Sequence, residues 1–136
     1  MPTTCDTSLL VPALLDWHPH HREARTLLTG HLDAIGCHVY VETFSVLTRL
    51  PDPRRPAPAI ARRVLEALER PLLPLSPQSY VAMVAAASDS GVGGGAIYDA
   101  VVGATARDHA HTLLTVDRRA RAAYDAVGAP FEFIDL

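Results

Sequence analysis

Four carboxylates occupy positions from which they could do chemistry together: Asp6, Glu42, Asp99 and Asp117. Asp6 follows the first predicted strand, and Asp117 ends the buried-strand pattern TLLTVD (112–117). Ligands of open parallel sheets bind just beyond the carboxyl ends of the strands, so we expect both aspartates at one rim. Converging carboxylates repel one another unless a cation lies among them, and their oxygens suit Mg²⁺ or Mn²⁺. The pattern therefore predicts a metal site that activates water for phosphoryl chemistry.

Asp99 lies inside an otherwise apolar stretch, IYDAVVGATA (97–106). If this stretch is a helix, small and apolar residues share the face of Asp99, which should therefore be buried. A buried carboxylate needs a cation, a salt bridge or a metal, so an arginine from elsewhere is the structural alternative to a metal ligand. Glu42, at the edge of the apolar face of its own helix, could instead be solvated or paired with Arg49.

Glycines crowd the segment before Asp99, and GVGGGA (91–96) satisfies the loose G-x-G-x-x-A form of a dinucleotide-binding turn. Such a turn needs a strand before the glycines. The preceding YVAMVAAASDS (80–90) is rich in alanine and helix-like instead. We therefore interpret the glycines as a tight helix–helix connection that leads the chain into the helix of Asp99.

Predicted strands alternate with predicted helices along the whole chain, which favours a parallel sheet covered by helices on both faces. The expected fold class is α/β, a three-layer α/β/α sandwich around a mostly parallel sheet. The strands are expected at 2–5, 71–76, 112–117 and 131–135. The helices are expected after the turn at 6–8, from Pro19 to Gly30 or Gly36, from 37 to before Pro51, and at 59–70, 77–88, 96–109 and 118–127.

Composition narrows the class of protein further. The 136 residues suffice for one domain, 1–136, with 49% hydrophobic and 20% charged residues. No apolar run is long enough for a transmembrane helix, and no signal peptide precedes the first strand, so we expect a cytoplasmic protein without membrane contact.

The two cysteines, Cys5 and Cys37, are expected to be free thiols. All 12 basic residues are arginines, which excludes lysine chemistry such as Schiff bases.

Four segments in order, CDTSLLVPALL, VETFSVLTRL, IYDAVVGATAR and LLTVDRRA, resemble the PIN-domain ribonucleases, and most closely the VapC-type toxins of bacterial toxin–antitoxin pairs. The resemblance spans nearly the whole chain. It implies that Asp6, Glu42, Asp99 and Asp117 hold one or two Mg²⁺ or Mn²⁺ ions, whose bound water cuts an RNA phosphodiester. The polar residues implied beside these acids are Thr7, Ser8 and Thr115.

The resemblance also implies partners for the chain. It predicts a homodimer and a cognate antitoxin whose C-terminal tail covers the active site. The RNA substrate would be structured, with loops of transfer or ribosomal RNA as the expectation for the family as a whole.

Arginines give a possible path for RNA although the net charge is −3. Without the four proposed metal ligands, 11 acids face 12 arginines. Arg118, Arg119 and Arg121 follow Asp117 directly, at the expected mouth of the site, and could hold RNA phosphates. A second cluster comprises Arg54, Arg55, Arg62 and Arg63. A solvated helix face or contacts with an antitoxin are the alternatives for both clusters.

Two other functions remain open from the sequence. A different metal-dependent phosphohydrolase, such as a phosphatase, usually has a second aspartate two residues after the first, and Ser8 stands there. A catalytically inactive module that binds RNA or an antitoxin would not need the four acids. The histidines of HPHH (18–21) lack further ligands at a spacing that suits zinc, so we expect them on the surface.

Overall fold

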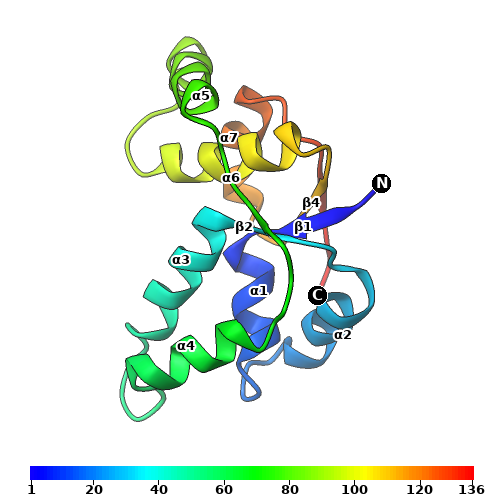
Figure 1. Ribbon diagram of the computed structural model, residues 1–136, viewed down its shortest axis with the longest axis vertical. Helices are drawn as coiled ribbons and strands as arrows, with labels where there is room; N and C mark the ends of the chain where they lie inside the picture. The colour runs from blue at the N-terminus through cyan, green and yellow to red at the C-terminus, as the bar shows by residue number, and fades with distance from the viewer.

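Five short parallel strands form the centre of the computed structural model, which describes residues 1–136 (Figure 1). One ladder pairs β4 with β1 on one side and β5 on the other, and a second ladder pairs β2 with β3. The backbone N–H groups of Asp33 and Ala34 donate to Thr3 O, at 3.1 and 3.3 Å, and connect the two ladders. The strands are Thr3–Cys5 (β1), Ile35–Gly36 (β2), Leu72–Leu73 (β3), Thr112–Thr115 (β4) and Phe131–Phe133 (β5).

Helices cover both faces of these strands. In Figure 1, α5, α6 and α7 lie above the strands and α1 to α4 lie below, which confirms the predicted α/β/α layers. The lower helices are Thr7–Leu14 (α1), His21–His31 (α2), Cys37–Leu47 (α3) and Pro58–Glu66 (α4). The upper ones are Pro77–Asp89 (α5), Ala96–Asp108 (α6) and Arg121–Ala126 (α7), the last preceded by the 3₁₀ turn η1, Arg118–Ala120. None of these helices combines the length and apolar character needed to cross a membrane.

The core lies between the sheet and both helical layers. Its largest fully buried side chains include Leu10 of α1, Ile35 of β2, Leu113 of β4 and Tyr124 of α7. Cys5 is buried in the same cluster, and both cysteines are free thiols as expected. A smaller apolar cluster joins α5, α6 and α7 around Met83.

Gly103 allows α6 and α7 to pack unusually close together. A Cβ atom at this position would lie 2.9 Å from Val127 Cγ2 and 3.1 Å from Tyr124 Cδ1. The close approach matters for the site described below, because α6 carries Asp99 and α7 carries Tyr124.

The structure corrects several boundaries. The helix expected at 59–70 ends at Glu66, and the one expected at 118–127 starts as a 3₁₀ turn. The strand expected at 112–117 ends at Thr115, and β2 was not expected at all. The glycine segment does connect two helices, α5 and α6, with positive φ at Gly91 and Gly94, so the interpretation as a connection is confirmed.

Candidate functional site

Asp6 is the most firmly held of the four acids. It follows β1 and caps α1, where its Oδ1 accepts a hydrogen bond from Ser8 N at 3.1 Å and another from Ser8 Oγ. Its Oδ2 accepts from Thr115 Oγ1 at 2.5 Å and from the Tyr124 hydroxyl at 2.6 Å. Burial raises the pKa of Asp6, and these hydrogen bonds counteract the rise. The carboxylate is therefore fixed in place by three side chains from three elements.

Ser8 and Thr115 also connect the ends of the neighbouring strands β1 and β4. Ser8 Oγ accepts from Val116 N at 3.0 Å, and Thr115 Oγ1 accepts from Asp117 N at 3.0 Å. The same hydroxyls donate to Asp6, so the backbone before Asp117 and the Asp6 carboxylate share two bridging side chains. The parallel pairing of β1 with β4 brings these groups together at one rim.

Glu42 reaches this rim from α3. Its carboxylate accepts from Thr7 Oγ1 at 2.8 Å and lies 3.2 Å from His38 Nε2, one helical turn before it. The hydrogen bond from His38 is the main cause that lowers the pKa of Glu42. Arg49 instead donates from Nε to Ser45 O, so the alternative of a Glu42–Arg49 hydrogen bond is not observed.

Asp99 is the least compensated acid. It lies half-buried in the first turn of α6, makes no ion pair with an arginine and accepts no hydrogen bond that would offset its burial. Burial, followed by the nearby charges of Asp117, Glu42 and Asp6, raises the pKa of Asp99 to about 6. The structural alternative of an arginine partner is therefore wrong, and the other three acids all lie near enough to raise the pKa of Asp99.

Asp117 caps the 3₁₀ turn that follows β4. Its Oδ1 accepts from Arg119 N at 3.0 Å and from Arg119 Nε at 3.2 Å. The Arg119 side chain is 94% exposed, so this ion pair is open to water and to competing anions.

The donor set fits a hard divalent ion, although no three acidic, histidine or cysteine side chains already lie close enough to enclose one. Mg²⁺ keeps several waters and uses only one or two carboxylates, so it does not require a closed protein cage. Asp99 supports this fit, because burial and three nearby acids disfavour the charge of its carboxyl more than His38 favours it.

Two of the contacts made by these acids were not predicted from the sequence. The hydroxyl of Tyr124 donates a hydrogen bond to Asp6, which is 118 positions away in the sequence, and His38 donates one to Glu42. The spacing of His38 and Glu42, four residues apart on one helix, was a usable signal. Nothing in the sequence near Tyr124 indicated that its hydroxyl reaches the first strand.

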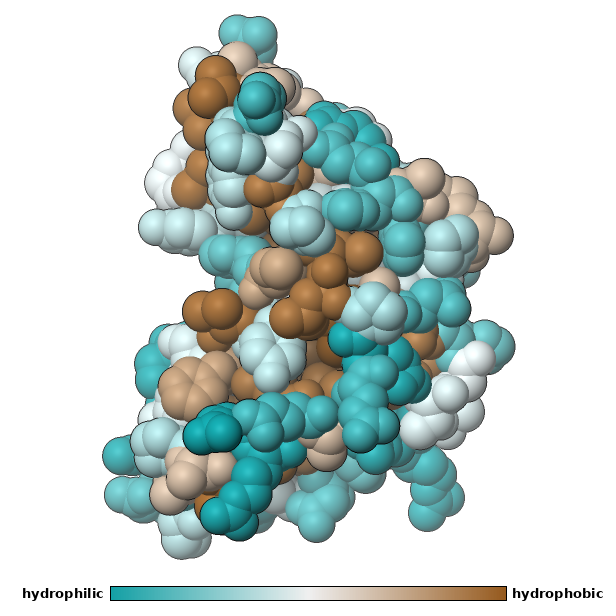
Figure 2. All heavy atoms as spheres, viewed as in Figure 1, coloured by the Kyte–Doolittle hydropathy of each residue, from teal (hydrophilic) through white to brown (hydrophobic).

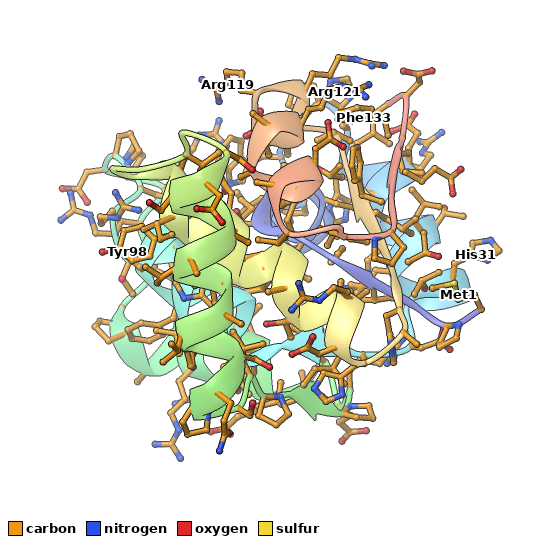
Figure 3. All side chains as sticks on the ribbon, turned by 90° about the horizontal axis from the view of Figure 1, so that it is seen from above. Met1, His31, Tyr98, Arg119, Arg121 and Phe133 are labelled. Atoms are coloured by element: carbon orange, nitrogen blue, oxygen red, sulfur yellow. The ribbon has the colours of Figure 1, made fainter.

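Arg119 and Arg121 lie along the same edge of the molecule, Arg121 next to Phe133 of β5 (Figure 3). Arg118 lies over the Phe133 ring at 4.7 Å and pairs with Asp135 at 3.2 Å. Arg121 lies over the same ring at 4.8 Å. In the second cluster, Arg62 pairs with Glu66 and Arg55 with Asp52, so those arginines are partly committed to other contacts.

A separate hollow of about 430 Å³ lies between α3 and α4. Its lining is mainly apolar and includes Tyr40, Phe44 and Leu65. None of the four acids lines it, so this hollow is not the chemical site.

Acids gathered at one rim of an α/β/α fold are typical of metal-dependent phosphoryl-transfer enzymes. The family model for the PIN domain matches residues 4–126 of the chain. The chain therefore belongs to the PIN-domain family. The chain is 38% identical to ribonuclease VapC40 of Mycobacterium tuberculosis (strain ATCC 25618 / H37Rv) over 130 residues, which cover 95% of this chain and 96% of the relative. Ribonuclease VapC27 of the same strain is 39% identical over 129 residues, or 93% of each chain. The resemblance expected from the sequence motifs is confirmed.

Two solved structures share the fold at 16% identity, a level that supports the fold alone. VapBC2 from Rickettsia felis, solved with a DNA fragment from its promoter, matches with a TM-score of 0.70 over 99% of this chain and 100% of that chain. FitAcB from Neisseria gonorrhoeae matches with a TM-score of 0.66 over 95% of both chains.

Proposed function

We propose that this chain is a Mg²⁺- or Mn²⁺-dependent endoribonuclease and the toxin of a toxin–antitoxin pair, with residues 1–136 acting as one nuclease domain in the cytoplasm. The observation that carries the proposal is Asp99, a half-buried acid near three other acids, with no hydrogen-bond donor or arginine partner and only a weaker opposing effect of His38 on its pKa. The ribonuclease names of relatives that match over more than nine-tenths of the chain support RNA as the substrate.

In such a site, different residues of the chain would bind the ion, orient the acids and bind the RNA phosphates. Asp99 and Asp117 would offer carboxylates to the ion, and Asp6 would be oriented toward it by Ser8, Thr115 and Tyr124. Glu42 would be oriented by Thr7 and His38. The bound metal would supply an activated water and neutralise charge on the phosphate. Arg118, Arg119 and Arg121 would hold neighbouring phosphates of the RNA.

The partners follow from the same proposal. Structured RNA such as transfer or ribosomal RNA would be the substrate, a cognate antitoxin would inhibit the toxin, and the toxin would be a homodimer. VapC-type names among the relatives and a VapBC complex among the structures of the same fold support the antitoxin. Three exposed apolar side chains on one face of α5, Tyr80, Val81 and Val84, support a contact between two copies.

Incubation of the purified protein with folded cellular RNAs, in Mg²⁺ or in EDTA, tests the function. We expect discrete cuts that require Mg²⁺, and we expect Asp99→Asn to abolish them and the growth arrest caused by expression, while the variant keeps its fold by circular dichroism. Phosphate release from small phosphoesters without RNA cuts would favour another phosphohydrolase. RNA binding without any cut would favour an inactive module, and full cleavage by Asp99→Asn would refute the site.

A further inference from the structure

Tyr98, the residue before Asp99, has an aromatic ring that is not buried in the core. Its side chain is 56% exposed, and its ring is stacked on the imidazole of His38, with ring centroids 5.7 Å apart and planes 4° from parallel. Figure 3 shows Tyr98 at the margin of the molecule, far from the edge that carries Met1 and His31. His38 therefore lies parallel to the ring and offset from it, and more than half of Tyr98 stays open to the solvent.

The stack is anchored to the acid site on both sides. His38 Nε2 lies 3.2 Å from Glu42 Oε2, and Glu42 is held in turn by Thr7. Tyr98 is covalently next to Asp99 in the first turn of α6. The ring of Tyr98, whose solvent-exposed side is called its outer face below, is therefore oriented by His38 of α3 beside two of the acids, Glu42 and Asp99.

An exposed, braced aromatic face beside a phosphodiester site has a chemical counterpart in RNA. Sequence-tolerant recognition of unpaired RNA relies on bases that leave their own stack and lie against aromatic side chains. The acids cannot supply this contact, and in the proposed site the arginines bind the phosphates. A ring already held parallel to an imidazole has less freedom to lose when a base stacks on it.

We propose that the outer face of Tyr98 stacks on one unpaired nucleobase of the RNA, at a nucleotide adjacent to the scissile phosphate. The inference rests on the proposed ribonuclease function and adds a base-binding position to it. Tyr98 would select an unpaired nucleotide at the cut and would hold the neighbouring phosphate near Asp99. His38 would be a positioning residue that braces the ring and Glu42 together.

Oligoribonucleotides that span a cleavage site mapped with the wild-type protein provide the test. Each carries 2-aminopurine, whose fluorescence falls on stacking, at one position on either side of the cut, and binding is measured in EDTA so that the RNA stays intact. We expect quenching at one of these positions with the wild type and with Tyr98→Phe. We expect no quenching with Tyr98→Leu, which keeps apolar volume but lacks the aromatic face.

Affinity and cleavage give a second readout. Tyr98→Leu and Tyr98→Ala should weaken RNA binding by about 5- to 150-fold, the range that follows from alanine substitution of base-stacking aromatics, whereas Tyr98→Phe should stay close to the wild type. Since the side chain is largely exposed, all three variants should unfold at the wild-type temperature.

The outcomes separate this inference from the proposed function. If the wild type cuts RNA and Tyr98→Leu binds and cuts equally well, base stacking is refuted while the nuclease stands. If Tyr98→Leu instead changes the mass of the toxin in solution, the exposed ring belongs to a protein contact and the inference is also refuted. If the wild type cuts no RNA, the proposed function itself fails.

Discussion

Asp6 and Asp99 are aspartates withdrawn from water at the same rim, and they differ in how their charge is compensated. Asp6 accepts hydrogen bonds from Ser8, Thr115 and Tyr124, which favour its ionised form. Asp99 has no such donors and is surrounded by acids. The first carboxylate is favoured in its ionised form by hydrogen bonds of the protein, and the second would gain from the cation that we propose.

Asp99→Asn should stabilise the metal-free protein, and more so at higher pH. Folding raises the pKa of Asp99 from 3.8 to about 6, so the favourable contribution of the protonated carboxyl exists at about pH 4 and is lost as the pH rises through about 6. Thermal unfolding in EDTA measures the effect. The gain in melting temperature of the variant over the wild type should be larger at about pH 8 than at about pH 4. An equal gain at both pH values would contradict the shift.

Tyr124→Phe should lower both stability and cleavage. The change removes the 2.6 Å hydrogen bond to the buried Asp6 carboxylate, and a bond to a charged group contributes about 1.5–3 kcal/mol to the free energy of unfolding. Urea unfolding measures that loss, and cleavage of RNA at saturating Mg²⁺ measures the effect on orientation. Tyr80→Phe, at an exposed tyrosine of α5, is the control and should change neither quantity. Unchanged stability of Tyr124→Phe would show that Asp6 does not need this donor.

The acids were predictable from the sequence because strand ends and a lone acid on an apolar helix face are local patterns, whereas their hydroxyl partners were implied only by the family resemblance. Ser8 and Thr115 indeed contact Asp6, and Thr7 contacts Glu42. The contacts of Tyr124 and Tyr98 were not predictable, because each depends on how two distant helices pack. The role of all these residues in catalysis stays a prediction.

At the scale of elements, long periodic segments were predictable and short ones were not. The helices α5 and α6 match their expected ranges within one residue at each end, because proline, serine and glycine mark their boundaries. The strand β2 consists of Ile35 and Gly36 alone, too short for a period of two residues to be visible. Two residues show no pattern from which the pairing of β2 with β3 could be predicted.

Gly103→Ala tests the close packing of α6 on α7. The new methyl group would lie within 2.9 Å of Val127 Cγ2, and overpacking of this kind costs about 1–3 kcal/mol. Chemical denaturation should show that loss, together with weaker cleavage because Tyr124 would be displaced from Asp6. Gly30→Ala is the matched control, since no atom lies within 4 Å of its Cβ position in α2 and alanine favours the helix there. A neutral Gly103→Ala would show that the two helices can separate without cost.

At the scale of the whole molecule, charge and apolar surface are unevenly distributed. Figure 2 shows hydrophobic residues mixed with hydrophilic ones at the upper left, where α5 lies, and further hydrophobic surface across the middle of this face. The net charge of −3 hides the local cluster of Arg118, Arg119 and Arg121. Association with RNA or with a second copy therefore depends on particular patches and not on the total charge.

Double substitution of Arg118 and Arg119 to alanine should weaken RNA binding in a salt-dependent way. For single-stranded RNA, the slope of log affinity against log salt concentration should fall by about 0.7 for each arginine that contacts a phosphate. Fluorescence anisotropy at several salt concentrations in EDTA measures the slope. The double substitution of Arg22 and Arg25 in α2 changes the net charge equally and should leave the slope nearly unchanged. Identical slopes for both double variants would exclude a direct role of Arg118 and Arg119.

Val81→Asp should convert the proposed homodimer into a monomer. Val81 is 74% exposed on the apolar face of α5, so a charge there costs little in the monomer but would be buried at a contact between two copies. Light scattering coupled to size exclusion measures the mass. Ile60→Asp, at an exposed position of α4, should leave the mass at the wild-type value. A dimer that survives Val81→Asp would place the contact elsewhere.

The hydrogen bond between Tyr124 and Asp6 joins residues 118 positions apart, and β1 pairs with β4 near the other end of the chain. During synthesis Asp6 and Ser8 leave the ribosome early, but Thr115, Asp117 and Tyr124 arrive only with the last quarter of the polypeptide. A nascent or prematurely terminated chain consequently lacks Asp117, one of the four acids, together with two of the three hydroxyls that hold Asp6. If the acid rim is the active site, as proposed, the ribosome that makes this chain is not exposed to a working copy until translation has passed α7.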